Sequence, residues 1–271
     1  SLSEFIFANE ALIRIGVFGA IFCLIACAEW QWPRRVLGVS QRVRWQNNLG
    51  LGLLNTENLR LIFPMAAVGA AAVAAEQGWG LFSFLGWSGG LAMGAAIVLL
   101  DLVVYLQHRA MHVIPLLWRV HRMHHADLDL DVTSGLRFHP FEMIISMAIK
   151  CGAVILLGAP VLSVVVFEVV LNGMSLFNHA NLRITKTVDR LLRWIVVTPD
   201  MHRTHHSVAV DERDANFGFN LAWWDYLFVT YRAVPRETHE RMVLGLPGMR
   251  QVSECCHLPS MLAMPFRKTS E

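Results

Sequence analysis

Histidine carries the chemistry that this sequence offers most clearly. Twelve histidines occur in 271 residues, and ten of them fall between His108 and His206, where even spacing would place about four. The motif HRAMH begins at His108, HRMHH begins at His121 and HRTHH begins at His202. Residues three and four positions apart on a helix share a face, and neutral imidazole is a common ligand of Zn, Cu, Fe and Ni. The spacing therefore predicts metal ligation.

The number of imidazoles indicates more than one ion. The three motifs supply eight histidines, whereas one ion takes roughly four to six ligands. His179, in Asn-His-Ala-Asn, makes a ninth, and His139, in Phe-His-Pro, is a ligand, a residue that supports a ligand, or a substrate contact. We expect a dinuclear site. No HExxH motif occurs, which argues against a zinc protease of that type.

The amino-acid composition indicates the class of protein that carries these histidines. Hydrophobic residues make up 55% of the chain and charged residues 16%, against about 25% charged in ordinary soluble domains. The net charge is +2, and no basic stretch is interleaved with aromatic residues, so no nucleic-acid partner is expected. Five cysteines without a CxxC motif indicate neither a disulfide scaffold nor a thiolate zinc site. We expect a polytopic, all-α membrane protein.

Four apolar regions are candidate membrane segments. The last of them is too long for one span and is interrupted by Gly158-Ala159-Pro160, so it is expected to form a hairpin of two helices. The expected segments are 11–28, 61–75 with part of 49–54, 81–100 continuing through 103–106, and the hairpin helices 143–157 and 161–177.

The charges between these segments predict the topology. Four arginines (34, 35, 42 and 44) follow the first segment, whereas 76–90 contains no Lys or Arg, so the arginine-rich loop is expected in the cytoplasm. A single membrane domain, 1–271, is expected to consist of membrane helices in 1–106, a first histidine-rich cap segment in 107–142, the hairpin in 143–177, and a second cap segment with the tail in 178–271. Both cap segments then lie on the cytoplasmic side.

Two charges inside the hairpin are expected at equal depth. Lys150 and Glu168 either pair across the hairpin or one of them faces the active-site cavity, because unpaired intramembrane charges are costly. Snorkelling of Lys150 to the interface is the alternative. Trp223 and Trp224 suit an interfacial belt, or else line a substrate mouth.

These motifs together resemble the fatty acid hydroxylase/sterol desaturase superfamily of integral-membrane diiron oxygenases. The resemblance covers about 101–235, roughly half the chain. Its motifs are the three histidine clusters, Asp101…Tyr105…His108, Arg-Phe-His-Pro-Phe-Glu at 137–142, Asn-His-Ala-Asn at 178–181, Thr-Pro-Asp at 198–200, Asn-Phe-Gly at 216–218 and Trp224-Asp225…Phe228. It implies four core membrane helices, an extra N-terminal one, and a cytoplasmic, histidine-rich helical cap.

The resemblance also implies the site and its cofactor, which is two iron ions, with zinc as an alternative in isolated protein. Asp101 is two turns before His108 and is expected either to orient a ligand imidazole or to be a helix-end residue at the membrane interface. Other candidate ligands or supporting residues are His139, Asn178 and Asn181, and no catalytic residue beyond the ligands is expected. The implied metal ligands are His108, His112, His121, His124, His125, His179, His202, His205 and His206.

The implied reaction is O2-dependent hydroxylation of a lipid, of fatty acyl, sterol or isoprenoid type, at an unactivated C–H bond. A desaturase using the same site and a non-catalytic metal-binding membrane protein are the alternatives. No cytochrome b5 domain is fused, so the electron donor is expected to be a separate ferredoxin or cytochrome b5 type reductase system. The lack of a targeting or retention signal favours a bacterial inner membrane over the endoplasmic reticulum.

Overall fold

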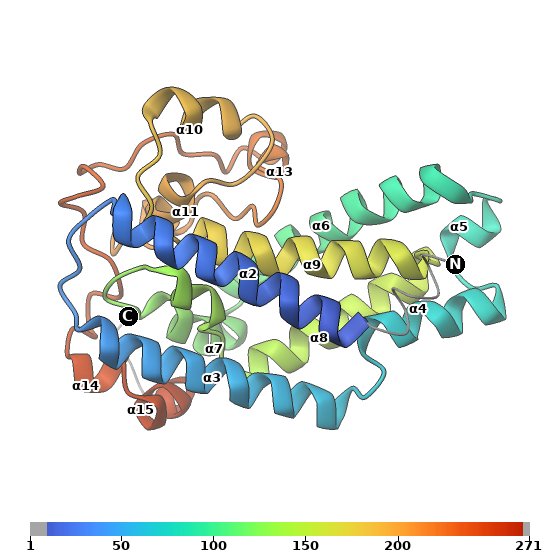
Figure 1. Ribbon diagram of the computed structural model, residues 1–271, viewed down its shortest axis with the longest axis horizontal. Helices are drawn as coiled ribbons and strands as arrows, with labels where there is room; N and C mark the ends of the chain where they lie inside the picture. Colours follow the sequence, from blue (N-terminus) through green and yellow to red (C-terminus); the bar gives the residue numbers. More distant parts are fainter. Residues whose placement is uncertain (1–9, 268–271) are drawn as a thin grey trace.

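The computed structural model describes residues 10–267, which form helices and no β-strand. Five long helices lie along one another in Figure 1: α2 (Glu10–Gln31), α3 (Gln41–Ile62), α6 (Gly89–Val113), α8 (Pro140–Leu157) and α9 (Val161–Asn178). Two shorter helices, α4 (Ala66–Gln77) and α5 (Leu81–Phe84), lie at one end of this bundle. The predicted all-α class is confirmed.

The opposite end of the bundle carries the cap. It holds short helices separated by loops, and the chain enters it twice, between α6 and α8 and again after α9. Its helices are α7 (Pro115–His125), η1 (Val132–Leu136), α10 (Lys186–Leu192), α11 (Pro199–His205), α12 (Val210–Arg213), α13 (Trp223–Leu227), α14 (Val252–Cys255), α15 (Leu258–Ala263) and η2 (Met264–Phe266).

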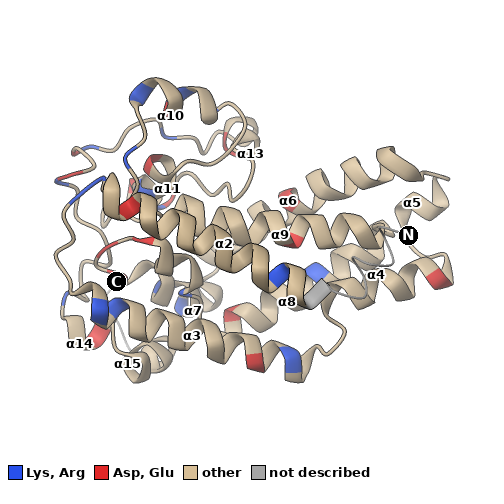
Figure 2. Cartoon of the chain, in the orientation of Figure 1, with Lys and Arg blue, Asp and Glu red and all other residues tan. Residues whose placement is uncertain are grey.

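The chain is a multi-pass membrane protein with five candidate spans. They are 12–31, 41–84, 89–113, 140–157 and 161–178. Charged residues gather at the cap end in Figure 2 and are sparse along the rest of the bundle. The second expected segment is divided at Pro64, because proline disfavours a helical conformation in the residue before it. Helix α3 ends at Ile62, and Phe63 is its C-cap with φ −123°. The third begins at Gly89 rather than at 81, since Leu81–Phe84 forms a separate turn of helix.

The predicted hairpin turn is confirmed, and it touches a second turn at the far end. Gly158 ends α8 with φ 64°, and Gly80 precedes α5 with φ 99°. A Cβ atom at Gly80 would lie 2.1 Å from the backbone nitrogen of Gly158. Only glycine permits both the left-handed backbone and this close approach, so the α4–α5 and α8–α9 connections pack directly on each other.

Small side chains let the helices approach closely inside the bundle. Ala67, Ala71, Ala92 and Ala96 are fully or almost fully buried and share a core with Phe167. Membrane helices associate through such small residues, because lipid provides no hydrophobic force to drive them together. The result is a packed membrane region whose helix ends point the histidine motifs into the cap.

The arginine-rich loop between α2 and α3 lies against this cap. Arg34 Nε donates to Asp200 Oδ1 over 3.0 Å, and the backbone nitrogen of Arg35 donates to Asn181 Oδ1 over 3.1 Å. This loop and both histidine-rich segments are therefore on one side of the bundle, as the topology predicted.

Candidate metal centre

The first five histidine positions are set by the joint between α6 and α7. His108 and His112 occupy the last turns of α6 on one face. The helix stops at Ile114, and Pro115 starts α7 at its first position, where a missing N–H costs nothing. The chain thus turns sharply, and α7 delivers His121, His124 and His125 near its C-terminal end.

The second half of the cap supplies four more imidazoles. His179 follows the last residue of α9 as its C-cap. Thr198 caps α11 by accepting from the backbone nitrogen of Met201, and Pro199 takes the first helical position. This short helix carries His202 and His205, and His206 is its C-cap.

All nine predicted ligand histidines come together, in two groups. In each group, one nitrogen per imidazole lies within 4.8 Å of every other. Each i, i+4 histidine pair stays within one group, and the histidine between them in HRMHH and HRTHH joins the other group. The five-histidine group is His108, His112, His121, His125 and His205, and the four-histidine group is His124, His179, His202 and His206.

The spacing of the nitrogens fits metal ions. In the five-histidine group, Nε2 of His205 is 3.1 Å from Nε2 of His108. In the four-histidine group, Nε2 of His179 is 3.0 Å from those of both His124 and His202. Two donors about 2.1 Å from one ion lie about 3.0 Å apart at a right angle and about 3.4 Å apart at a tetrahedral angle. The observed separations, together with the 3.2 Å between His121 and His125 and between His202 and His206, lie within this range.

Hydrogen bonds fix which nitrogen faces each group centre. Nδ1 of His108 contacts the carbonyl of Phe217 at 2.8 Å, and Nδ1 of His179 contacts that of Ser175 at 2.7 Å. A carbonyl only accepts, so Nδ1 carries the proton and Nε2 presents a lone pair. His124 and His205 are held in the same way by the carbonyls of Arg137 and Ala215. Nitrogen lone pairs that face one another at this distance repel, and a cation bound between them would offset the repulsion. The cluster therefore requires a bound cation at each group centre.

Two carboxylates support two more imidazoles of the five-histidine group. Glu142 Oε1 lies 2.8 Å from Nδ1 of His121, and both side chains are buried. Asp214 Oδ1 lies 3.3 Å from Nδ1 of His112, whose Nε2 is buried without a hydrogen-bond partner among the described residues. Sequence reasoning assigned neither carboxylate a role. The signal for Glu142 was a carboxylate in the first turn of a largely apolar helix.

The other candidate residues do not support imidazoles. His139 is the N-cap of α8, with Nδ1 accepting from Phe141 and Nε2 3.2 Å from the carbonyl of Leu262, so it lies outside both groups. Asn178 donates to the carbonyl of Phe219 at 3.0 Å, and Asn181 binds Arg35 in the arginine-rich loop. These three residues build the cap around the site.

The expected role of Asp101 as an imidazole partner is wrong. Its Oδ2 accepts from Nε1 of Trp224 at 2.8 Å and from the backbone nitrogen of Leu221 at 3.1 Å. Trp224 is correspondingly 8% exposed, so it is no part of an interfacial belt, whereas Trp223 is 45% exposed. Helix α6 thereby holds the loop whose Phe217 carbonyl orients His108.

Burial keeps six of the ligand histidines in the cap neutral. Desolvation lowers the pKa of His124, His125, His202 and His206 well below the usual range. It also lowers the pKa of His179 to about 4 and that of His205 to about 3. Neutral imidazole is the coordinating form, so the cluster is ready to bind cations at neutral pH.

A buried ionic network holds the segment after α7. Arg44 of α3, fully buried, binds Asp127 through two hydrogen bonds of 3.0 and 2.9 Å and also pairs with Asp131. Burial alone would raise the pKa of Asp127, but the charges of Arg44 and Arg137 together with hydrogen bonds from Arg44 and Ser134 outweigh it and lower that pKa to about 2. Arg137 ties the carbonyl of Met123 to that of Cys255 in the C-terminal segment. The histidines of α7 are thus fixed by three parts of the chain.

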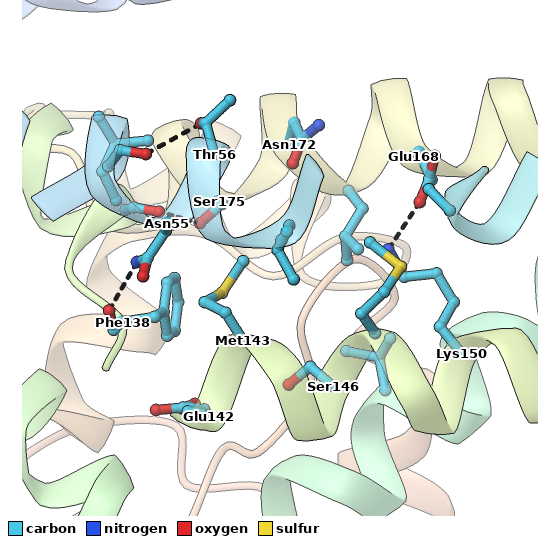
Figure 3. A pocket seen from close by; sticks show the side chains of 18 of the residues that line it. Asn55, Thr56, Phe138, Glu142, Met143, Ser146, Lys150, Glu168, Asn172 and Ser175 are labelled. Carbon is cyan, nitrogen blue, oxygen red and sulfur yellow. Dashed lines mark hydrogen bonds and ion pairs between the residues drawn. The ribbon is translucent and has the colours of Figure 1, made fainter. Parts of the chain in front are cut away.

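A cavity of about 830 Å³ opens onto the histidines. Its apolar stretch is lined by Leu100 and Val104 of α6, Met143 and Met147 of α8, and Leu171 of α9. Figure 3 shows part of it between α3, α8 and α9. Four histidines line it as well: His108, His121, His124 and His202. Both groups therefore face one apolar space inside the membrane bundle.

The predicted ion pair lies in this cavity. Lys150 Nζ is 2.8 Å from Glu168 Oε1, which confirms the pairing across the hairpin (Figure 3). Both residues also line the cavity, so the pair forms across the hairpin and faces the cavity at the same time. Arg14 of α2, which the sequence analysis did not connect with this pair, is a third member, at 2.7 Å from Glu168 Oε2.

Comparison with known proteins places this arrangement in a family. A family model described as fatty acid hydroxylase matches residues 93–230, which contain all nine histidines of the two groups. No solved structure matches the chain.

Several curated relatives share this region. An ornithine lipid hydroxylase of Rhizobium tropici is 31% identical over 55% of this chain and 44% of its own length. An alkylglycerol monooxygenase of Xenopus tropicalis is 28% identical over 54% of this chain and 31% of its own length. A very-long-chain aldehyde decarbonylase of Oryza sativa subsp. japonica is 25% identical over 60% of this chain and 26% of its own length. The chain spans less than half the length of these relatives.

Proposed function

Because the chain belongs to the fatty acid hydroxylase family, we propose that it is a membrane enzyme that uses O2 to hydroxylate a lipid at an unactivated C–H bond. The observation that carries this proposal is the opening of two buried imidazole groups onto a single apolar cavity within the membrane bundle. The hydroxylase and monooxygenase names of two relatives support it.

We assign two iron ions to the site, one to each histidine group. The five-histidine group exceeds the four ligands usual for structural zinc. Bound iron would supply the activation of O2, which histidine side chains cannot perform themselves. The imidazoles would hold the ions. Backbone carbonyls that accept from Nδ1 fix the orientation of four of these rings, those of His108, His124, His179 and His205.

The cavity has the lining that a hydrocarbon substrate requires. Met143 and Met147 of α8 face it together with Leu100 and Val104 of α6. Such a lining excludes water from the reacting carbon and holds a flexible chain against the histidine groups. Hydroxylation of a C–H bond by O2 consumes two electrons and two protons and yields an alcohol and water. The two electrons must come from a separate donor. We assign their supply to a ferredoxin or cytochrome b5 type reductase system.

We propose that the protein lies in a bacterial inner membrane and that its metal site is on the cytoplasmic side. Support for the side comes from the arginine-rich loop that contacts the cap, since such loops remain cytoplasmic. Support for the membrane comes from the bacterial origin of the ornithine lipid hydroxylase.

Metal content and lipid products together test the proposal. Protein purified from iron-supplemented cells is expected to contain about two iron ions, as the ligand count requires, and cells that express it are expected to gain a lipid with one added oxygen atom. His121→Ala and His202→Ala should lose metal and product, whereas His257→Ala, an exposed histidine outside the groups, should keep both.

Three results would contradict this function. The first is folded protein without metal, the second is one ion that is indifferent to His121 and His202, and the third is iron-loaded protein that changes no lipid. A lipid that loses two hydrogens instead of gaining oxygen would identify a desaturase at the same site.

A further inference from the structure

The cap carries an apolar surface around α13, beside the cap end of α6 (Figure 1). Two parts of the chain form it: Nε1 of Trp223 donates to the backbone carbonyl of Trp194 at 2.8 Å, and the rings of Trp194 and Tyr226 stack with centroids 6.2 Å apart. Contiguous apolar surface of this kind marks a place where a protein contacts a membrane or another protein. We call it the α13 surface, and its exposed members are Trp194, Ile195, Trp223, Tyr226, Leu227 and Val229.

The outside of both segments is free of charge. No charged side chain in 191–196 or 223–229 is exposed. Arg193 pairs with Asp189 at 2.8 Å, and Asp225 is fully buried, with Oδ1 accepting from the backbone nitrogen of Phe217. The two charged residues within these segments are therefore turned inward, as expected for a surface that lies against an apolar medium.

The turn after α13 presents an apolar side chain outward with a strained backbone. Val229 has φ 57°, a left-handed conformation that β-branched residues rarely adopt, and it is 89% exposed. The backbone carbonyl of Asp225 fixes this turn by accepting from the backbone nitrogens of Thr230 and Tyr231 at 2.8 and 3.1 Å. Strained positions of this kind cluster at functional sites.

Contacts with α6 place the α13 surface at membrane depth. The ring of Phe228 stacks on that of Tyr105 with centroids 5.2 Å apart, and Nε1 of Trp224 donates to Asp101, one turn earlier in α6. Tyr105 is 16 residues after Gly89, the first residue of α6, which is about 24 Å of helix. Because the hydrocarbon core of a bilayer is about 30 Å thick, Tyr105 lies inside the core when Gly89 lies at its far edge.

The exposed residues around α6 agree with this placement. Trp79 and Trp87, both exposed, precede α6 at the far end, as expected for an aromatic belt at one bilayer surface. Toward the cap, apolar side chains of α6 remain exposed at Leu106 and Val113, beyond Tyr105. The bilayer therefore extends past Tyr105, and Phe228 brings the end of α13 to that level.

We propose that the α13 surface is embedded in the boundary between phospholipid headgroups and acyl chains next to α6, so that one edge of the cap is anchored in the membrane. The aromatic side chains of the surface suit this boundary, since a Trp or Tyr ring is apolar at one end and polar at the other. This inference goes beyond the proposed lipid oxidation and does not depend on it.

Photo-crosslinking identifies what covers the surface. p-Benzoylphenylalanine would replace Leu227 or Val229 in the full chain, and the protein would be irradiated both in the membranes of the expressing cells and in phospholipid nanodiscs. We expect intact-mass analysis to show the addition of one phospholipid at both positions. The yield should be within about twofold of that for the same probe at exposed Leu106 of α6, because all three positions would lie against acyl chains.

Val36 is the matched control position. It is apolar and 93% exposed, but it lies in the arginine-rich loop beyond the cap end of α2. The probe there is expected to give at most about a fifth of the phospholipid adduct, because this loop has no contact with a membrane helix at bilayer depth.

A charge on the surface tests the anchor directly. Leu227→Glu, measured with the probe at Val229, is expected to lower the phospholipid adduct by about threefold or more, because an ionised side chain is costly in the acyl region. Val252→Glu, at an exposed position of α14, should leave it unchanged. Size-exclusion profiles and iron content show which variants are folded. If substitutions of Leu227 are not tolerated, the probe at Val229 in the otherwise unchanged chain carries the test, since this side chain is largely exposed.

Three results would overturn the inference. The first is phospholipid adducts at Leu227 and Val229 no higher than at Val36. The second is a product of twice the chain mass in cell membranes without phospholipid adduct, which would identify an interface between two copies instead. The third is an adduct at Val229 that Leu227→Glu leaves unchanged. Because no readout uses turnover, phospholipid adducts in a protein that oxidises no lipid would refute the proposed reaction alone.

Discussion

His124 and His125 are consecutive residues whose imidazoles belong to different histidine groups, with ring centroids 5.5 Å apart and planes at 87°. Helix geometry separates them, because consecutive side chains on α7 point about 100° apart. His125 faces His121, one turn earlier, at 3.2 Å, and His124 faces His179 at 3.0 Å. One helical turn thus contributes to both groups.

Substitution of either neighbour should therefore affect one ion more than the other. In His124→Ala the four-histidine group keeps three ligands, and in His125→Ala the five-histidine group keeps four. We expect His124→Ala to hold about one iron firmly and His125→Ala to retain more, because fewer ligands remain in the smaller group. Iron per chain after mild chelation measures this. Equal and complete loss in both variants would contradict two separate groups.

Glu142 is expected to tune the metal site through His121. Glu142→Gln removes the carboxylate charge next to Nδ1 of His121. Substitution of such a supporting residue typically lowers metal affinity by about 10–100-fold. Competition with a chelator measures the affinity. Asp101→Asn is the matched control, because it neutralises another buried carboxylate that binds Trp224 instead of an imidazole. An equal drop in both variants would mean that Glu142 acts through folding rather than through His121.

Removal of Arg44 should destabilise the cap. Arg44→Met leaves Asp127 and Asp131 buried without their common cation, and such a loss typically costs about 3–5 kcal/mol. Thermal unfolding in detergent would show a lower transition temperature. Arg42→Met, at an exposed position two residues earlier, is expected to be close to neutral. Similar melting of the two variants would refute a structural role for the network.

His239 should make the protein sensitive to mild acid. Its pKa is lowered to about 4, chiefly by burial, although Asp200 lies 3.5 Å away, and Arg34, Arg193 and Arg203 oppose protonation. The unfolded imidazole takes up a proton near pH 6.5, so the unfolded state binds more protons between these values. Stability is therefore complete above about pH 6.5 and falls as the pH drops toward 4.

His239→Gln is expected to lose part of this acid sensitivity. The drop in melting temperature between pH 7.5 and pH 5 should be smaller in the variant than in the parent. An identical pH profile in both proteins would show that His239 is not held neutral in the fold. His257→Gln, at an exposed position, serves as the control and should leave the profile unchanged.

Local sequence determined much of the architecture. The Gly158-Ala159-Pro160 interruption marked the hairpin because it acts on the backbone directly, whatever surrounds it. The i, i+4 spacing determined which histidines of one helix share a group, since helix geometry alone sets that relation. The equal depth of Lys150 and Glu168 followed from the same hairpin, and their contact confirms it.

Only the tertiary structure decided which helices share an ion site and what stands behind each imidazole. His205 joins His108 across 97 residues, and backbone carbonyls, which sequence does not distinguish, orient four of the rings. The prediction for Asp101 failed for the same reason: a correct helix face does not say whether a histidine or Trp224 packs against it. Residue type and spacing fix local geometry, whereas partners distant in sequence depend on how the helices pack together.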